Sequence, residues 1–183
     1  MPEPTTRGVR QRFAPSAVNY HALRILGPRL PRLARGWMPW VGLERYPPPP
    51  LPGPDWVRLR PLLSGVCGTD ISLLTGHASA VLSPFASFPA VLGHEVVATV
   101  TESGTAAGVA AGTRVVLDPL LGCTVRGITP PCEWCAAGQP GLCLRTAEGG
   151  FAPGPMIGFC SDLPGGWSDE VVAHLSQLHV VPE

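Results

Sequence analysis

The chain has 183 residues, 45% hydrophobic and 14% charged, which is enough apolar material for one domain with a buried core. Its 13 basic residues, all arginine, balance 13 acidic residues, so the net charge gives no reason to expect a nucleic-acid or membrane partner. No apolar run approaches the length of a membrane span, and the N-terminus lacks a secretory-signal pattern, so we expect a cytoplasmic protein. The 22 glycines and 23 prolines, scattered among Val and Leu, predict many short strands and turns.

The first part of the chain is rich in arginine and proline. Ten of the arginines fall within residues 1–60, and a proline run at 47–50 forms a stiff, extended connector. We expect residues 1–52 to be a largely solvated extension in which residues 20–26 could pair as an edge strand. A polyanion-binding arm or a subunit contact is the alternative for its basic residues.

Strand patterns follow the connector. Residues 56–60 alternate apolar and polar side chains, as a half-buried strand does. Four more short runs predict strands, at 96–100, 114–117, 170–174 and 178–181. Residues 70–74 could form one helical turn, with Thr69 or Asp70 as its cap. Because strands and helices do not alternate as in a parallel sheet, we expect a mainly β fold with few short helices.

Four of the six cysteines lie within 21 residues. Cys132 and Cys135 have the Cys-x-x-Cys spacing, which lets two thiolates face one ion across a tight turn. Seven residues separate Cys135 from Cys143, and eight separate Cys123 from Cys132. The segment has few apolar side chains, whereas structural zinc can contribute about 10–16 kcal/mol to the folding of such a peptide. We therefore predict a structural zinc lobe at residues 119–146.

Two other interpretations of these cysteines are open. An even number of cysteines can indicate disulfides in a secreted protein, but no export signal is evident. A redox Cys-x-x-Cys motif normally opens a helix after a strand in an α/β fold, and neither feature is evident around this pair. Structural zinc is therefore the interpretation that we favour.

A second candidate site is sparser. In a Gly-Val-Cys-Gly-Thr-Asp run, the thiol of Cys67 is followed by Thr69 and Asp70, and His94-Glu95 begins 27 positions after Cys67. Taken singly, Cys67 could be a small buried residue and His94 a turn histidine. Taken together, they offer a thiolate and an imidazole with carboxylates nearby, which is a donor set for a catalytic metal.

Four motifs, in this order, resemble the catalytic domain of the zinc-dependent medium-chain alcohol dehydrogenases. They are the Gly-Val-Cys-Gly-Thr-Asp run at 65–70, the Gly-His-Glu segment within 88–97, the Gly-Thr-Arg-Val turn at 112–115, and the four-cysteine lobe. The resemblance covers residues 53–183. It implies a GroES-like antiparallel β-barrel with a Cys-rich structural zinc lobe, and an active site at the barrel's edge facing a nucleotide-binding domain.

The resemblance also implies residue roles. Cys67 and His94 match the family's catalytic zinc ligands, and Glu95 matches the acid beside that zinc, which can act as an alternate ligand. Thr69 matches the hydroxyl that hydrogen-bonds the substrate alcohol and starts its proton relay, and Asp70 matches the carboxylate that orients the ligand histidine. The implied cofactors are one structural zinc, one catalytic zinc, and NAD or NADP.

The sequence departs from the family pattern in three ways. Thr129 stands where the family's commonest lobe has a cysteine, so Cys123 must complete the set, with Cys160 as the fallback. The family's third catalytic zinc ligand is expected beyond Glu183. Finally, no Gly-x-Gly-x-x-Gly fingerprint follows a strand in residues 1–183, so the dinucleotide-binding half is not among them.

The resemblance predicts the catalytic-domain portion of an enzyme that oxidises a small-molecule alcohol to an aldehyde or ketone by hydride transfer. We expect these 183 residues to be inactive without a nucleotide-binding domain. Homo-oligomers are an open option. The alternative is a non-catalytic zinc module with a structural or partner-binding role, and a test of NAD(H) or NADP(H) binding would discriminate the two.

Overall fold

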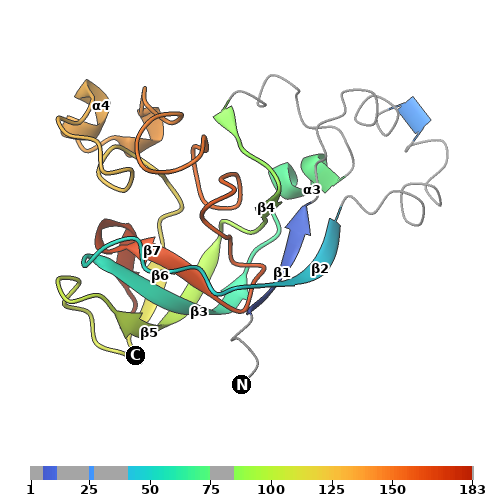
Figure 1. Ribbon diagram of the computed structural model, residues 1–183, viewed down its shortest axis with the longest axis horizontal. Helices are drawn as coiled ribbons and strands as arrows, with labels where there is room; N and C mark the ends of the chain where they lie inside the picture. Colours follow the sequence, from blue (N-terminus) through green and yellow to red (C-terminus); the bar gives the residue numbers. More distant parts are fainter. Residues whose placement is uncertain (1–5, 12–24, 27–40, 75–84, 183) are drawn as a thin grey trace.

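The computed structural model describes residues 6–11, 25–26, 41–74 and 85–182, which form two antiparallel sheets (Figure 1). The larger sheet has the strand order β7-β3-β5-β6-β8, and the smaller has the order β2-β1-β4. The strands are β1 (Thr6–Gln11), β2 (Val41–Tyr46), β3 (Trp56–Ser64), β4 (Ala90–Val91), β5 (Val96–Ser103), β6 (Arg114–Leu117), β7 (Val171–His174) and β8 (Leu178–Val180). In the described part of the chain, helices are few and short: α3 (Gly68–Leu74), α4 (Glu133–Ala136), and the 3-10 turns η2 (Pro140–Leu142) and η3 (Leu175–Gln177).

The larger sheet is curled into a half-barrel. Its two edge strands, β7 and β8, are consecutive in the chain and are joined only by the three residues of η3. Because so short a connection cannot cross a flat five-stranded sheet, the two edges must approach each other. The expected mainly β, GroES-like architecture is confirmed.

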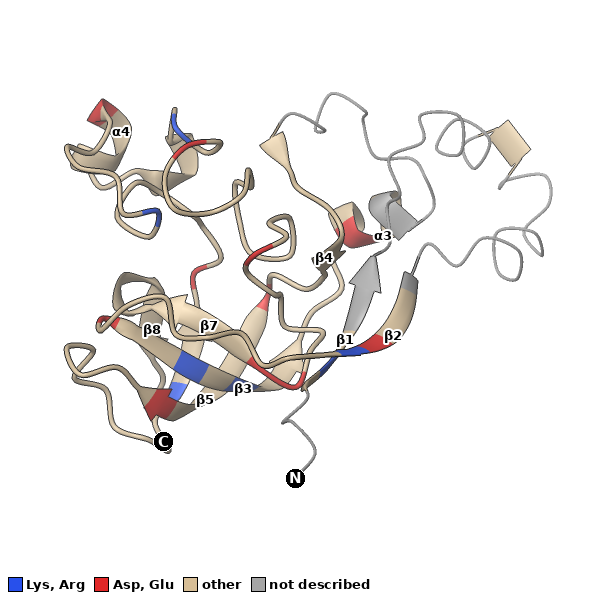
Figure 2. Ribbon diagram, viewed as in Figure 1, with Lys and Arg blue, Asp and Glu red and all other residues tan. Residues whose placement is uncertain are grey.

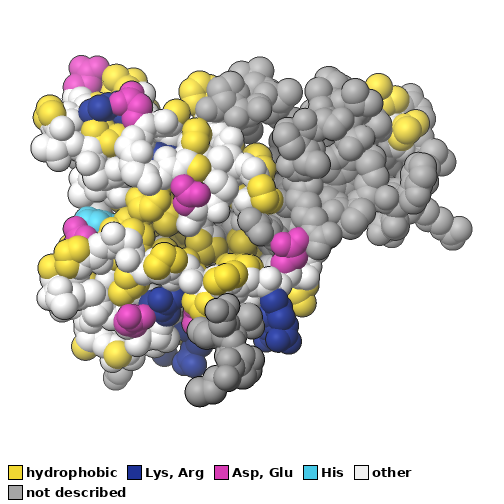
Figure 3. Space-filling model, viewed as in Figure 1, with side chains coloured by type: hydrophobic (Ala, Val, Ile, Leu, Met, Phe, Trp, Pro, Cys, Tyr) yellow, Lys and Arg dark blue, Asp and Glu magenta, His cyan; other side chains and the backbone are white. Residues whose placement is uncertain are grey.

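Alternating side chains explain these strands. In β5, Val96, Ala98 and Val100 are buried while Thr101 is exposed, so one face of the strand points into the core. Each of the five predicted strands is present, within a few residues of its expected ends. In the view of Figure 3, hydrophobic side chains gather in the middle of the molecule, between the larger sheet and the segment that carries α4. The main core comes from the larger sheet and from the connection between β6 and β7: Trp56, Val57, Leu59, Val96, Ala98, Val100, Val115, Leu117, Leu121, Ile157, Leu163, Val171 and Val172.

Part of the expected extension belongs to the folded structure. β1 pairs with β2 on one side and with β4 on the other, and Thr6 is buried. The edge strand expected at 20–26 is wrong in its described part, because Ile25 and Leu26 are helical; residues 20–24 lie outside the described residues. The division of the chain at residue 52 stays a prediction.

The proline-rich connector is tied to the sheet by Arg58 of β3. Arg58 Nε donates to Glu102 Oε2 of β5 at 2.8 Å. Its Nη1 donates to the Pro49 carbonyl oxygen at 2.9 Å and lies 3.3 Å from Glu170 Oε2. In Figure 2, ribbon segments coloured for basic and for acidic residues are interspersed along the larger sheet. The guanidinium therefore holds the connector against the strand that it leads into.

A histidine–aspartate pair closes the curled sheet beside η3. His174 Nδ1 accepts the backbone N–H of Ser176 at 3.1 Å, so Nε2 carries the proton that is donated to Asp55 Oδ2 at 2.8 Å. This hydrogen bond holds the pKa of Asp55 below its ordinary value of 3.8. Because Asp55 precedes β3 and His174 ends β7, the pair links the start of β3 to the end of β7, which are far apart in the sequence.

The lowered pKa predicts a pH-dependent contribution of Asp55 to stability. The contribution is complete above the ordinary aspartate pKa of 3.8 and is lost as pH falls through the lowered, folded-state pKa. We expect Asp55→Asn to lower the free energy of unfolding by at most about 1 kcal/mol at pH 7. The difference between the two proteins should shrink as the pH falls below 3.8 and through the lowered pKa of Asp55. Urea unfolding at a series of pH values measures it, and a difference that stays constant down to pH 2.5 would contradict the assignment.

Candidate metal centres

The four-cysteine lobe lies in the long connection between β6 and β7, at the top left of Figure 1 around α4. Its backbone turns sharply after Cys123, where Ile128 N donates to the Cys123 carbonyl oxygen at 2.9 Å and Gly127 has a φ of +67°. Cys132 occupies the N-cap of α4 and Cys135 lies within the helix. This arrangement places the Cys-x-x-Cys sulfurs on one side of a single helical turn.

The structure brings the four predicted lobe cysteines together. The sulfurs of Cys123, Cys132, Cys135 and Cys143 all lie within 4.8 Å of one another. Cys123 Sγ and Cys143 Sγ are 3.7 Å apart. Four sulfurs at about 2.3 Å from a tetrahedral zinc would be separated by about 3.8 Å, so the cluster fits that ion.

Backbone N–H groups point at these sulfurs. Cys132 N donates to Cys123 Sγ at 3.3 Å, and Arg145 N donates to Cys143 Sγ at 3.4 Å. The N–H groups of Cys135 and Leu144 lower the pKa of the Cys132 thiol to about 6, whereas burial raises the pKa of the Cys135 thiol to about 12. Without a cation the cluster therefore cannot carry four thiolates at neutral pH, and binding of a metal there would release protons.

Cys160 lies elsewhere. It is buried in the main core and its thiol contacts the Ala152 carbonyl oxygen at 3.3 Å. Burial raises the pKa of this thiol, as expected for a protonated core cysteine. The geometry thus groups Cys123, and not the fallback Cys160, with the other three lobe cysteines.

Sequence reasoning missed Arg126, which organises the lobe. Its side chain is among the largest that are fully buried. Nη1 donates to the carbonyl oxygens of Glu148 and Phe151, at 2.7 and 3.0 Å. Nη2 donates to those of Ala152 and Gly154, at 2.8 and 3.0 Å. One guanidinium therefore satisfies four carbonyls of a loop that lacks regular structure. A lone arginine in a turn carries no sequence signal for such a role.

The second candidate site is built on the start of α3. The helix begins at Gly68, so the expected cap at Thr69 or Asp70 is wrong: the Cys67 sulfur accepts the Thr69 N–H at 3.2 Å. In return, Asp70 Oδ2 accepts the Cys67 N–H at 3.0 Å, and Asp70 is fully buried. These reciprocal bonds resemble a capping box and fix the Cys67 side chain.

His94 completes this cluster from the segment before β5. Its Nε2 lies 3.3 Å from Cys67 Sγ, and its Nδ1 lies 3.7 Å from Asp70 Oδ1. Among the described residues, neither His94 Nδ1 nor Asp70 Oδ1 has a hydrogen bond. A tetrahedral zinc bound by one sulfur and one imidazole nitrogen would separate those atoms by about 3.5 Å, so the pair fits.

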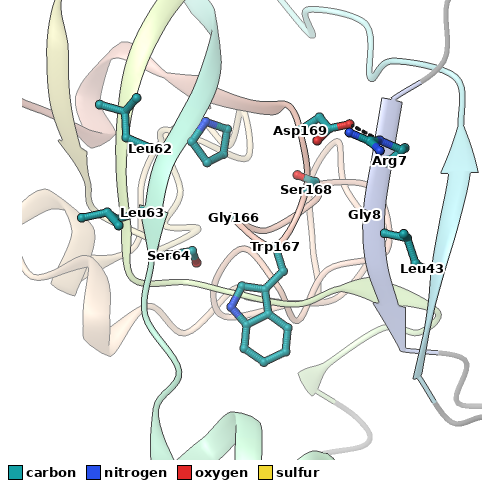
Figure 4. Close-up of a pocket in the computed structure, with 11 residues that line it drawn as sticks. Arg7, Gly8, Leu43, Leu62, Leu63, Ser64, Gly166, Trp167, Ser168 and Asp169 are labelled. Carbon is teal, nitrogen blue, oxygen red and sulfur yellow. Dashed lines mark hydrogen bonds and ion pairs between the residues drawn. The ribbon is translucent and has the colours of Figure 1, made fainter.

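The structure does not bring Glu95 into this cluster. Its side chain is exposed and packs against the backbone of Gly65. Thr69 is exposed in the first turn of α3, beside Cys67. A cavity of about 380 Å³ lies between the two sheets and is lined by Arg7, Leu43, Leu63, Trp167 and Asp169 among others, but not by Cys67, Asp70 or His94 (Figure 4). None of the helices in the described part of the chain has the length and apolar character of a membrane span.

Comparison with known proteins places most of the chain in one family. Residues 53–183 match the model of the alcohol dehydrogenase GroES-like domain. The starvation-sensing protein RspB of Escherichia coli is 32% identical over 137 residues, which are 73% of this chain and 34% of that protein. Rv1895 of Mycobacterium tuberculosis, named a probable zinc-binding alcohol dehydrogenase, is 32% identical over 78% of this chain and 33% of its own length. The chain thus spans about a third of these relatives.

Solved structures share the fold. A proposed zinc-binding dehydrogenase from Sinorhizobium meliloti, bound to NADP, superposes with a TM-score of 0.64 at 25% identity. The match covers 98% of this chain and 39% of that one. A cobalt- and zinc-bound thermostable alcohol dehydrogenase from Pyrobaculum aerophilum gives 0.64 at 20% identity, covering 98% of this chain and 42% of its own.

The buried guanidinium predicts a large loss of stability for Arg126→Met. The substitution leaves several carbonyls of residues 148–154 without a donor, and each such group costs about 1–3 kcal/mol. We therefore expect the free energy of unfolding to fall by about 3 kcal/mol or more, measured by denaturant titration of the zinc-loaded protein. Arg145→Met is the matched control, because Arg145 is a partly exposed arginine of the same lobe paired with Glu148. It should cost much less than Arg126→Met, because an exposed ion pair contributes little to stability, and equal losses for the two variants would contradict the role of Arg126.

Proposed function

Because the chain belongs to the alcohol dehydrogenase GroES-like domain family, the N-terminal domain of zinc-dependent medium-chain alcohol dehydrogenases, we propose that it supplies the catalytic-domain part of such an enzyme. The observation that carries this proposal is the cluster of Cys67, His94 and Asp70, whose donor atoms lie within 4.8 Å of one another. The substrate class is a small-molecule alcohol, oxidised to an aldehyde or ketone.

In this proposal Cys67 and His94 hold the catalytic zinc. His94 binds through Nε2, since that nitrogen faces the Cys67 sulfur while Nδ1 faces Asp70. Asp70 keeps the imidazole in that orientation, and its carboxylate is itself fixed by the Cys67 N–H. When bound, zinc supplies a Lewis acid that makes the hydroxyl of an alcohol more acidic.

Thr69 is the residue that we assign to proton transfer. It lies in the first turn of α3 beside Cys67, and its exposed side chain is accessible to a substrate. Its hydroxyl accepts the proton of the alcohol and passes it toward solvent. The hydride leaves the carbinol carbon for the nicotinamide of NAD or NADP, so the alcohol loses two electrons and two hydrogens in total.

The proposal leaves two parts of the enzyme to residues outside this chain. The first is a third protein ligand for the zinc; Glu95, whose exposed side chain lies outside the cluster in this structure, would have to turn toward the metal to act as the alternate ligand. The second is the dinucleotide site, for which the NADP bound to the Sinorhizobium meliloti protein is the supporting observation. We assign a second, structural zinc to Cys123, Cys132, Cys135 and Cys143, because their shell is closed by four sulfurs.

The two sites predict different metal losses. Cys135→Ser should release one equivalent of zinc and lower the melting temperature, because the lobe then lacks one of its four ligands. The metal at Cys67 and His94, which is held more weakly, should stay bound in this variant. In the parent protein, mild chelation should remove this metal before it removes the lobe zinc. Cys160→Ser is the matched control and should keep both metals. Metal content by mass spectrometry and thermal melts measure the effect, and a Cys135→Ser protein with parental values would refute the structural site.

The assigned proton transfer predicts a selective effect on turnover. We expect no alcohol oxidation from residues 1–183 alone, and activity once they are joined to the nucleotide-binding half of a relative. In that fusion, Thr69→Ala should lower kcat by about 10²-fold or more, since a positioned proton acceptor contributes that much. Metal content should not change, and Thr69→Ser should restore most of the rate. An unchanged kcat in Thr69→Ala would overturn the assignment.

A further inference from the structure

Residues 165–167 lie against the segment that leads into His94. Gly165 N donates to the Val91 carbonyl oxygen at 2.9 Å, and Trp167 N donates to that of Leu92 at 3.0 Å. Gly166 N donates to the Gly93 carbonyl oxygen at 2.8 Å. These three bonds fix the backbone directly before His94.

The same short segment also reaches the strand end that leads into Cys67. Trp167 Nε1 donates to the Gly65 carbonyl oxygen at 3.0 Å. The Gly65 N–H in turn donates to the Glu95 carbonyl oxygen at 2.8 Å. Gly65, two residues before Cys67, is therefore held from both sides by groups that neighbour His94 in the chain or in space.

The contacts around Trp167 leave little room for adjustment. A Cβ atom added to Gly93, which has a φ of +92°, would lie 2.5 Å from Trp167 Cδ1. A Cβ added to Gly165 would collide with the carbonyl groups of Leu92 and Gly93. Figure 4 shows the Trp167 side chain extending from the same segment as Gly166 and Ser168, on the side of Ser64. Backbone approach this close means that the three segments cannot slide past one another without breaking hydrogen bonds.

We propose that Trp167 is a positioning residue for the Cys67/His94 metal site: its indole N–H, by holding the Gly65 carbonyl, sets the separation of the Cys67 sulfur from the His94 nitrogen. This inference rests on the proposed function of that cluster. A metal accepts ligand atoms only within a few tenths of an ångström of their ideal positions, so a freed Gly65 would weaken binding. An aromatic ring without an N–H fills the same space but cannot make the bond.

The experiment is a cobalt titration of the full chain, its Trp167→Phe variant and a matched control. Cobalt(II) bound by thiolates absorbs visible light, and the four-sulfur lobe and the Cys67/His94 site give different spectra. The lobe should take the first equivalent alike in all three proteins, which also reports that each is folded. We expect the dissociation constant for the second equivalent to rise about tenfold in Trp167→Phe, with an altered spectrum.

Trp56→Phe is the matched control. Trp56 is a buried tryptophan that packs edge-on against Phe151 and His174 in the main core, away from the cluster. Trp56→Phe removes the same part of an indole as Trp167→Phe does. The dissociation constant of this control for the second equivalent of cobalt should stay within twofold of the parent value.

Each other outcome overturns the proposal in a distinguishable way. Equal binding of the second equivalent by the parent and Trp167→Phe would overturn the role of Trp167 alone and leave the proposed function intact. Loss of both equivalents in Trp167→Phe, but not in Trp56→Phe, would show a general role in folding instead. A parent protein that binds one cobalt only would remove the Cys67/His94 metal site, and with it both the inference and the proposed function.

Discussion

The connection between β6 and β7, residues 118–170, has little regular structure, so the hydrogen-bonding groups of its backbone must be satisfied in other ways. Three anchors do this. The cysteine sulfurs accept backbone N–H groups in the lobe, Arg126 donates to four carbonyls of the following loop, and residues 165–167 pair with residues 91–93. The cysteine lobe is itself the first of these anchors, and the Cys67/His94 cluster lies next to the third. The irregular part of the molecule, and not the sheet, therefore determines where its chemistry can take place.

The two clusters differ in the way that structural and catalytic metal sites differ. The lobe offers four sulfurs from one short stretch of chain, and its exposed Trp134 and Leu142 side chains bury little apolar surface. The other cluster draws Cys67 and Asp70 from the start of α3 and His94 from before β5, with few donors and an exposed hydroxyl beside them. A shell that is not filled by protein leaves room for a substrate oxygen. Its geometry then depends on contacts made outside the shell.

Sequence patterns predicted the elements whose signal is local. The strands from 56 to 181 alternate or are rich in β-branched residues, and the lobe cysteines have a ligand spacing of their own. The Cys67/His94 pair rested on a family resemblance, because a separation of 27 positions in the sequence fixes no distance in space. The helix start was misplaced because a thiol, rather than Thr69 or Asp70, acts as the cap. The hydrogen bonds of Arg126 and Trp167 were not predicted, because both side chains bind backbone carbonyls, which any sequence supplies.

The pairing of β3 with β7 has a consequence for the order in which the chain folds. Residues 56–59 pair with residues 171–174, so one edge of β3 stays open until residue 174 has been synthesised. Closing a loop of that length carries a large entropic cost, and contacts so distant in sequence slow folding. During that time β3 presents unpaired N–H and C=O groups, which is the geometry that templates aggregation. If the cysteine lobe binds the proposed structural zinc before β7 is made, the metal would shorten the loop that remains to be closed, and would so limit how long the edge of β3 is exposed on the ribosome.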